Sequence, residues 1–372
     1  MKFSLFYEMQ ISDPTPEREA RLFHECVEQS VLADRLGYHC IWAVEHHGLY
    51  EYSHSSAPEI FLSFVAARTK RIRIGHGVTL TPGRYNHPIR IAERVAVLDI
   101  LSGGRVQWGS GKSGTFVEQG AFEIDRTTFH DEWREAAEII PRMWTEDVFS
   151  HRGRFYDIPP TRIVPKPVQR PHPPMFAACS KPELARLVGA LGMGALNVAV
   201  YPPDVLARRV AEYREAVAGC RQPAGKSITN WFACNPATIV LRDDLEACRW
   251  GLRGGQFFLK SLVHYFATDR RPTGPVSAPR EAPDDGFLEK FCEHRHAPNT
   301  SLSSIVGSPD HARRIVQRFV DVGVDELILV MQLGTVPHEI VMESIRTFAE
   351  EVMPHFTRTS DKEDRHVVAT DR

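Results

Sequence analysis

One stretch of the sequence decides the fold: Ile41-Trp42-Ala43-Val44-Glu45-His46-His47. Its apolar residues suit a buried strand, and they end abruptly in a carboxylate and two imidazoles. In a β/α barrel the strand ends open into the active site, so a strand that ends in ionisable side chains is typical of a barrel mouth. Imidazoles can bind or release a proton near neutral pH. The stretch therefore predicts a parallel barrel that is an enzyme.

The rest of the chain alternates short apolar runs with amphipathic stretches, which predicts parallel strands joined by helices. Gly37 is expected to end the first helix, and Ser308-Pro309 is expected to begin a later one. The expected strands are 2–7, 40–44, 72–80, 106–109, 175–178, 195–200, 228–241 and 326–331. The expected helices include 17–36, 59–68, 87–101, 129–144, 182–191, 309–323 and 337–354.

Two segments interrupt this alternation. Residues 145–174 include seven prolines between Asp157 and Pro174, too many for a helix or a central strand. An interdomain linker is one interpretation, but the alternation resumes at once, which favours an excursion within one barrel. Residues 268–304 are rich in Pro, Asp, Arg and Glu and suit a mobile flap over a site, with disorder as an equal alternative. We therefore expect one barrel over 1–356 and a polar, frayed tail over 357–372.

Composition narrows the class of protein. The 372 residues are 42% apolar, which predicts a globular chain with a sizeable core. The formal charge of −2, with both signs interspersed, gives no electrostatic reason to expect nucleic acid or a membrane surface as a partner. The seven cysteines lack zinc-ligand spacing, which predicts no metal site and reduced thiols in a cytoplasmic protein. No signal-peptide core or run of eighteen apolar residues appears.

Glu45, His46 and His47 are the first candidates for chemistry. Alternate side chains of a strand face opposite sides, so Glu45 and His47 would share one direction and His46 the other. A role in proton transfer is the favoured interpretation for His46. For Glu45 a hydrogen bond to the backbone at the strand end is favoured over a catalytic role.

A glycine-rich segment follows the fourth strand: Trp108-Gly109-Ser110-Gly111-Lys112-Ser113-Gly114. Its glycines would let backbone amides approach an anion, and Lys112 adds a charge that suits a phosphate. The end of the segment resembles a P-loop, but the earlier glycine of a P-loop would have to be at position 106, which is Val106. A plain glycine-rich turn is an equal alternative.

Two further segments lie at strand ends. Ser180, in Ala177-Ala178-Cys179-Ser180, could cap the next helix, whose first amides would favour a phosphate, although capping alone explains the serine. A nucleophilic Cys179 is less favoured, because no base is evident for it. In Gly75-His76-Gly77-Val78 the glycines permit strained backbone or the close approach of a ligand, or form a simple β-bulge.

Taken together, these stretches resemble the bacterial luciferase-like flavin monooxygenases, from Lys2 to about Phe356. The order and spacing of the motifs carry the resemblance, which also guided the count of eight strands. Besides 41–47, the motifs are His87-Pro88-Ile89-Arg90 to Val95, Leu98-Asp99, Leu101-Ser102-Gly103-Gly104-Arg105, Val306-Gly307-Ser308-Pro309 and Val352-Met353-Pro354.

The resemblance implies a single (β/α)8 TIM barrel, with excursions after the fourth and seventh strands, that binds reduced FMN at the C-terminal ends of its strands. It also implies a two-component monooxygenase, in which a separate flavin reductase uses NAD(P)H to supply the reduced FMN. Oxygen would then form a flavin C4a-peroxide or hydroperoxide that oxygenates a small organic substrate. A homodimer packed through barrel helices is a further implication.

The resemblance also assigns roles to individual residues. His46 and His47 match the histidines of the family's Glu-His-His motif, and the first of them assists proton transfer. Lys112 and Ser180 fall where the family contacts the flavin phosphate. Gly77-Val78 matches a position where members often have a non-prolyl cis peptide beneath the flavin ring. The other expected cofactor-binding residues are Gly111, Ala178 and Cys179.

Departures from the family pattern leave alternatives open. Gly111 replaces the reactive cysteine of the luciferases proper, which weighs against light emission, and Cys179 replaces a family glutamate at the phosphate site. A deazaflavin-dependent oxidoreductase that transfers hydride on the same barrel is the first alternative. A metal-dependent hydrolase that uses Glu45, His46, His47 and His76 is a weaker one. A flavin-binding relative without activity is a third.

Overall fold

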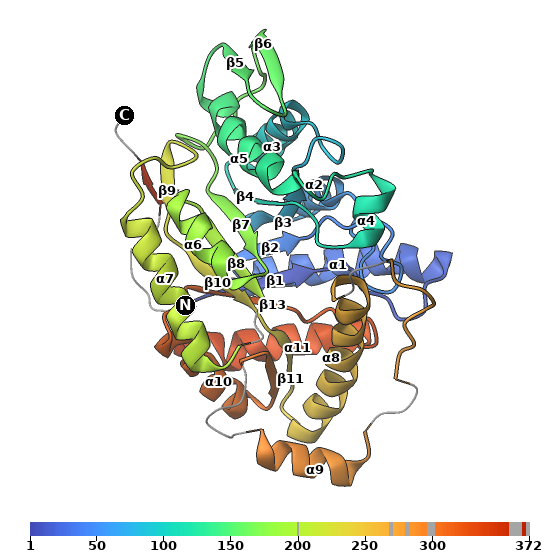
Figure 1. Cartoon of the computed structure of the whole chain (residues 1–372). Coiled ribbons are helices and arrows are strands. Elements are labelled where there is room, and N and C mark those ends of the chain that lie inside the picture. The colour runs from blue at the N-terminus through green and yellow to red at the C-terminus, as the bar shows by residue number, and fades with distance from the viewer. Residues whose placement is uncertain (199–200, 268–270, 280–282, 296–301, 357–366, 370–372) are drawn as a thin grey trace.

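The computed structural model describes residues 1–372 except 199–200, 268–270, 280–282, 296–301, 357–366 and 370–372 (Figure 1). Eight parallel strands form a closed barrel in the order β1, β2, β3, β4, β7, β8, β10 and β13, with helices around it, which confirms the predicted TIM barrel. The barrel strands are β1 (Lys2–Tyr7), β2 (Cys40–Ala43), β3 (Arg73–Leu80), β4 (Val106–Gly111), β7 (Met175–Cys179), β8 (Gly194–Val198), β10 (Phe232–Asn235) and β13 (Glu326–Leu329).

Local sequence signals explain where the outer helices begin and end. The Thr15 side chain caps α1 by accepting a hydrogen bond from the Arg18 amide, and Gly37 ends that helix with a φ of 84°. The larger helices around the barrel are α1 (Pro16–Leu36), α2 (Pro58–Arg68), α3 (Pro88–Ser102), α5 (Phe129–Thr145), α6 (Pro182–Ala190), α7 (Pro203–Ala218), α8 (Asp244–Phe266), α10 (Pro309–Asp321) and α11 (His338–Glu351). A short 3-10 helix, Met353–His355, follows α11.

Large aromatic side chains fill the inside of the barrel. The rings of Trp42 and Phe176 meet edge to face at 5.2 Å, and both side chains are buried. Gly75 makes room for this packing, because a Cβ at that position would lie 2.5 Å from the Trp42 ring. Glu326 is buried with these rings and accepts hydrogen bonds from the indoles of Trp42 and Trp231. The interior is therefore a packed core, and a ligand has to bind at one of its ends.

Two excursions leave the barrel. After β4 come α4 (Phe116–Ala121), α5 and an antiparallel hairpin of β5 (Phe149–Arg152) and β6 (Asp157–Thr161), which projects from the top of the molecule in Figure 1. After β10 come β11 (Ala237–Val240), α8, α9 (Asp285–His294) and β12 (Ser304–Gly307), and β11 pairs in parallel with β12. The first excursion places α4 near α8, so both excursions border the same region.

The structure corrects the expectation of one long strand over 228–241 and adds secondary structure to two other segments. The strand expected over 228–241 is three strands, β9 (Ser227–Thr229), β10 and β11, and only β10 joins the barrel. Pro236, which cannot donate to a strand ladder, lies between β10 and β11. The segment proposed as a flap contains the helix α9. The tail is not frayed at Val367–Ala369, where β14 pairs antiparallel with β9, while 357–366 lie outside the described residues.

None of the helices in the described ranges is long and apolar enough to span a membrane.

Candidate active site

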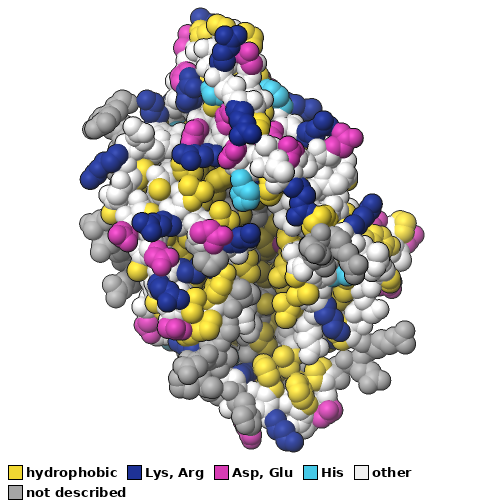
Figure 2. Space-filling model, in the orientation of Figure 1, with side chains coloured by type: hydrophobic (Ala, Val, Ile, Leu, Met, Phe, Trp, Pro, Cys, Tyr) yellow, Lys and Arg dark blue, Asp and Glu magenta, His cyan; other side chains and the backbone are white. Residues whose placement is uncertain are grey.

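The residues expected at the active site lie at the C-terminal ends of four neighbouring strands. His46 and His47 follow β2, Gly77 and Val78 lie in β3, and Lys112 follows β4. Ala178 and Cys179 end β7 beside them, and Ser180 comes next. Figure 2 shows a hollow between the side of the molecule that carries α6 and α7 and the side that carries α4 and α8, with hydrophobic side chains along it. The barrel thus brings together segments that are far apart in the sequence.

His46 lies between two buried carboxylates. Its Nδ1 is 2.9 Å from Oε1 of Glu118, and its Nε2 is 3.7 Å from Oε2 of Glu8. Burial opposes a charge on the imidazole, but Glu118, Glu8 and Glu45 outweigh it and raise the pKa of His46 to about 9. His46 is therefore protonated at neutral pH and can hold a proton where water has little access.

Glu118 is fixed by the start of α4. Thr115 caps this helix, and its hydroxyl donates to Oε2 of Glu118 at 2.7 Å, as does the hydroxyl of Ser113. Oε1 accepts from His46 and from the backbone amide of His47 at 3.0 Å. Burial acts to raise the pKa of Glu118, but His46 and these donors lower it overall. Glu118 is therefore a charged acceptor that orients the imidazole.

Glu8, on the other side of His46, has a different environment. Its Oε1 accepts a hydrogen bond of 2.9 Å from the Tyr52 hydroxyl, while Oε2 has no hydrogen-bond partner among the described residues. Burial is the largest effect on this carboxylate and raises its pKa to about 7, although His46 and Tyr52 act against the shift. Glu8 can therefore gain or lose a proton near neutral pH, beside an imidazole that stays protonated there.

Glu45 and His47 form a separate group. Glu45 accepts hydrogen bonds from the Leu80 amide and the Asn86 side chain, both at 2.8 Å, which confirms the favoured structural role. Nε2 of His47 lies 3.3 Å from the same carboxylate, so these two side chains do share a direction. The His47 ring also packs against Phe122 at 4.8 Å. Glu45 therefore joins β2 to β3, and His47 lines the entrance beside it.

The end of α8 covers His46. The Phe266 ring meets the His46 imidazole edge to face at 5.7 Å, and Tyr52 packs on both rings. Two other phenylalanines of the same helix do not contact the imidazole: Phe257 is fully buried, and the Phe258 ring packs against Tyr52 at 5.6 Å. The apolar cover over the imidazole is therefore Phe266.

One carboxylate joins α8 to the segment that follows it. Glu51 accepts a hydrogen bond of 2.6 Å from the Tyr265 hydroxyl and one of 2.9 Å from the amide of Val276. Glu51 thus holds the segment around Val276 next to the end of α8, close to the residues that cover His46.

The backbone near the end of β3 contains a non-prolyl cis peptide. The peptide bond between Gly77 and Val78 is cis, as the resemblance implied. The Val78 side chain packs against β4, where a Cβ at Gly111 would fall well inside van der Waals contact of its methyl group. A side chain at position 111 would therefore clash with Val78 unless one of the two strands shifted, so the packing favours glycine there.

The region expected to bind phosphate contains a cation without a carboxylate partner. Among the described residues Lys112 has no ion pair, and its ammonium lies over the Trp133 ring at 5.3 Å. Burial lowers the pKa of Lys112, and Lys181 adds to that shift. Burial also raises the pKa of the Cys179 thiol to about 12, which argues against a nucleophilic cysteine. This arrangement suits an anionic group.

One expectation in this region is wrong. Ser180 does not cap α6, because the N-cap residue is Lys181 and no side chain bonds the first amides of the helix. Ser180 is exposed, so its hydroxyl remains accessible to a ligand.

The residues of the metal alternative do not converge. His76 faces away from the mouth toward α2 and α3, where Glu59 and Arg94 influence its pKa, and burial lowers that pKa to about 4. Within the described ranges, the cluster of potential ligands that does converge is Asp244, Cys248 and Cys292, on α8 and α9. A hydrolytic metal centre built on His46 and His76 would need a different geometry.

A TIM barrel whose mouth contains coupled imidazole and carboxylate groups defines a barrel enzyme. The sequence profile of the luciferase-like monooxygenases matches residues 1–326, and the chain belongs to this family. Its members and relatives include flavin-dependent monooxygenases and F420-dependent dehydrogenases.

Three relatives illustrate this range. The oxygenase component of the flavin-dependent trigonelline monooxygenase of Acinetobacter baylyi is 35% identical over 193 residues, which are 49% of this chain and 50% of that protein. The chain thus spans about half the length of this relative. The F420-dependent hydroxymycolic acid dehydrogenase of Mycobacterium tuberculosis is 30% identical over 251 residues, which are 63% of this chain and 67% of that protein. The monooxygenase RslO1 from Streptomyces bottropensis superimposes with a TM-score of 0.80 at 25% identity, over 96% of this chain and 100% of its own.

Sequence reasoning missed the partners of His46. Glu118 and Glu8 lie in segments with no evident motif for proton chemistry, and Phe266 lies in a helix that was not expected. One local signal was available, because Thr115 and Glu118 have the spacing of a capping box. That signal predicts the start of a helix, but not which imidazole the carboxylate binds.

Proposed function

We propose that this protein is the oxygenase component of a two-component monooxygenase that uses reduced FMN and O2 to oxygenate a small organic substrate. The observation that carries the proposal is His46, held between Glu118 and Glu8 and covered by Phe266. A charged imidazole in an apolar enclosure can stabilise developing negative charge on oxygen and can supply a proton while water is excluded. Reduced flavin, when bound, supplies the electrons and delivers one oxygen atom to the substrate.

The residues at the mouth fit such a cofactor. Lys112, half-buried and without a carboxylate partner, would hold the phosphate as a point charge, and Ser180 is free to donate a hydroxyl. The cis bond at Gly77-Val78 and the bare Gly111 would lie under the ring system. Ala178 and Cys179 would line the same bed from β7.

Different residues of the chain would then donate the proton, replace it and exclude water. His46 would donate from Nε2, since Nδ1 is engaged by Glu118. Glu8, with a pKa of about 7 and a free Oε2 at 3.7 Å, would return a proton to Nε2 between turnovers. Phe266 and Tyr52 would keep bulk water away from this step. His47 would orient groups at the entrance.

Partners follow from the same proposal. The relative from Acinetobacter baylyi is an oxygenase component, which supports a separate flavin reductase as the partner that uses NAD(P)H. A homodimer is supported by an apolar surface on α2 and α3, where Ile60 and Leu101 are each 70% exposed and Phe64, Val97 and Ile100 are exposed beside them. Exposed apolar patches of this kind are typical of subunit interfaces.

Hydride transfer with F420 is the second candidate, because F420-dependent dehydrogenases are among the relatives. The enclosed cation at His46 suits both chemistries, because hydride transfer to a carbonyl also places negative charge on oxygen, and the similarity to a flavin-dependent monooxygenase at 35% identity favours oxygen activation. Lys112 would serve the anionic tail of F420 as well as a phosphate of FMN, so cofactor binding has to be measured directly.

Rapid mixing tests the proposal. Protein loaded anaerobically with reduced FMN is mixed with oxygenated buffer, and flavin absorbance is followed, with reduced FMN alone as the control. We expect an absorbing species that precedes oxidised flavin and outlasts the control by at least about tenfold. Reoxidation at the rate of free FMN, together with tight binding of F420, would reject the monooxygenase and establish the second candidate.

A further inference from the structure

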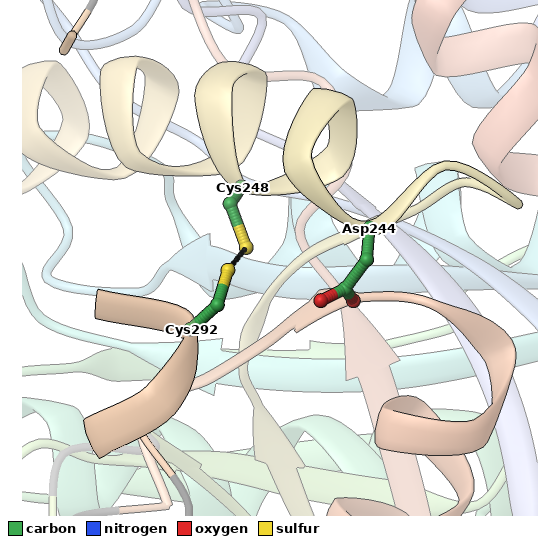
Figure 3. A group of neighbouring side chains, drawn as sticks. All are labelled: Asp244, Cys248 and Cys292. Carbon is green, nitrogen blue, oxygen red and sulfur yellow. Dashed lines mark hydrogen bonds between the residues drawn. The ribbon is translucent and has the colours of Figure 1, made fainter. Parts of the chain in front are cut away.

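A pair of cysteines joins two helices of the excursion after β10. Cys248 lies on α8 and Cys292 on α9, and their sulfur atoms are 2.9 Å apart, in thiol contact and without a disulfide (Figure 3). Cys248 is fully buried, whereas Cys292 is partly exposed. Leu288 and Val306 pack around Cys248 and hold the two helices together. The two sulfur atoms therefore need little movement to bond.

Arg295 gives this pair an unusual electrostatic environment. Its Nη1 donates to Sγ of Cys248 at 2.8 Å and to the carbonyl of Val306 at 2.9 Å, and its Nη2 pairs with Asp244 at 2.5 Å. Arg295 itself is buried. Burial raises the pKa of the Cys248 thiol, and the guanidinium of Arg295 opposes that rise by stabilising the thiolate with a donor that is already in place.

The same contacts argue against a metal ion at this cluster. Both carboxylate oxygens of Asp244 are in use, one by Arg295 and the other by the amide of Ser308 at 2.6 Å. Hydrogen bonds from these two donors lower the pKa of Asp244 to about 2, although its partial burial opposes the shift. A divalent cation would have to displace or repel the buried guanidinium, which leaves only the two sulfur atoms as ligands.

We propose that Cys248 and Cys292 form a redox-modification site, where hydrogen peroxide converts the two thiols into a disulfide that links α8 to α9. The accessible sulfur of Cys292 attacks a peroxide oxygen, the O–O bond breaks, and water leaves behind a sulfenic acid. The sulfur of Cys248 then attacks Cys292, the S–O bond breaks, and a second water leaves. The two sulfurs lose two electrons in total to one peroxide, and the thiol protons end in the two waters.

The location gives the bond a consequence. Besides the sulfur pair and its apolar surroundings, Arg249 of α8 pairs with Asp285 of α9 at 2.7 Å on the exposed side. A disulfide would replace these breakable contacts by a covalent link between two helices of one excursion. A flavin monooxygenase of the proposed kind releases hydrogen peroxide when it reduces oxygen without a substrate. This source of oxidant rests on the proposed function, whereas the cysteine site itself does not.

The test uses the full-length protein without flavin, so its outcome is independent of the proposed function. Hydrogen peroxide is added in steps, free thiols are counted after denaturation, and the crosslink is located by peptide mapping under non-reducing conditions. We expect the seven thiols to fall to five, with a mass loss of about 2 Da, a single Cys248–Cys292 crosslink, and full reversal by dithiothreitol. The thiols of Cys248 and Cys292 should be lost at least about tenfold faster than those of the other five cysteines.

Two variants and a matched control sharpen the test. Cys248→Ser should leave a sulfenic acid at Cys292 that a dimedone probe captures, and Cys292→Ser should abolish the crosslink. Cys220→Ser removes a lone cysteine elsewhere and should not change the crosslink. Equal oxidation of all cysteines, or a crosslink at other positions, would overturn the proposal. So would one zinc ion per chain that protects both thiols from peroxide, since the cluster would then be a metal site.

Discussion

Both ends of the barrel bury a carboxylate, but its partners differ. At the C-terminal mouth Glu118 binds the imidazole of His46, which can lose a proton. At the N-terminal end Glu326 accepts from the indoles of Trp42 and Trp231 at 2.9 and 2.8 Å, and these donors stay neutral. A buried glutamate therefore takes part in a titratable pair at the C-terminal mouth and in a purely structural set of hydrogen bonds at the N-terminal end.

Two largely buried histidines repeat this contrast. His46 has a pKa raised to about 9, because the surrounding carboxylates outweigh the cost of burial. His39, at the N-terminal end, stacks on Trp231 and borders a cavity of about 800 Å³. Burial lowers its pKa to about 3, and Arg73 and Lys2 lower it further. Burial alone does not make a proton-transfer residue, and the sign of the neighbouring charges decides the outcome.

The largest expected effect comes from replacing the histidine at the mouth. In His46→Ala, oxygenated product per flavin oxidised should fall about 100-fold or more, because the enclosed proton donor is gone while flavin binding remains. The measurement compares product with released hydrogen peroxide under single turnover. His39→Gln is the matched control, and it should keep normal coupling. Normal coupling in His46→Ala would remove the distinction between the two ends.

The next effect concerns stability at the N-terminal end. Glu326→Ala leaves two buried indole donors without an acceptor and opens a cavity, which should lower the free energy of unfolding by about 3 kcal/mol. Urea denaturation measures it. Glu326→Gln keeps an acceptor and should lose less. In both variants the folded molecules should give the normal yield of oxygenated product per flavin oxidised. A lower yield would show that the two ends of the barrel are not independent.

This contrast also explains what could be predicted from the sequence. Local periodicity predicts the positions of most strands and outer helices, although the family resemblance guided the count of eight strands. Gly37 and Ser308 are the residues that cap helices α1 and α10 in the structure. The position of His46 at a strand end follows from the same pattern. Its pKa does not, because Glu118 lies 72 residues away and meets the imidazole only through the closed barrel. Distant charge pairs have no local signature.

Other failures have the same cause. The apolar run at 228–241 satisfies the pattern of one long strand, yet its last part pairs with β12 outside the barrel. Nothing local distinguishes β10 from β11 except Pro236. Phe266 covers His46 because α8 folds back over the mouth, a path that depends on tertiary contacts such as that between Glu51 and Tyr265. Local periodicity carries no information about such contacts.

A third prediction concerns the pH dependence of stability. The raised pKa of His46 contributes stability that is complete below about pH 6.5 and is lost as pH rises through about 9, and that of Glu8 contributes stability lost between about pH 4.5 and 7. Glu118→Gln removes the main partner of the imidazole, so the decline between pH 6.5 and 9 should become shallower by about 2 kcal/mol. Urea titrations at several pH values measure this. An unchanged decline would assign it to other groups.

The smallest expected effect compares cations at the two ends. Lys112→Met removes a single point charge from the mouth and should weaken binding of FMN about tenfold, with a smaller dependence on salt. Arg73→Met removes a charge from the cavity at the N-terminal end and should not change FMN binding. Fluorescence titration of both variants at two salt concentrations separates these cases. Salt screens the influence of an exposed charge beyond a Debye length of about 8–10 Å, so Arg73 should not affect a phosphate bound at the mouth. If Arg73→Met weakened FMN binding as much as Lys112→Met, the cofactor phosphate would have to be assigned to the N-terminal end of the barrel.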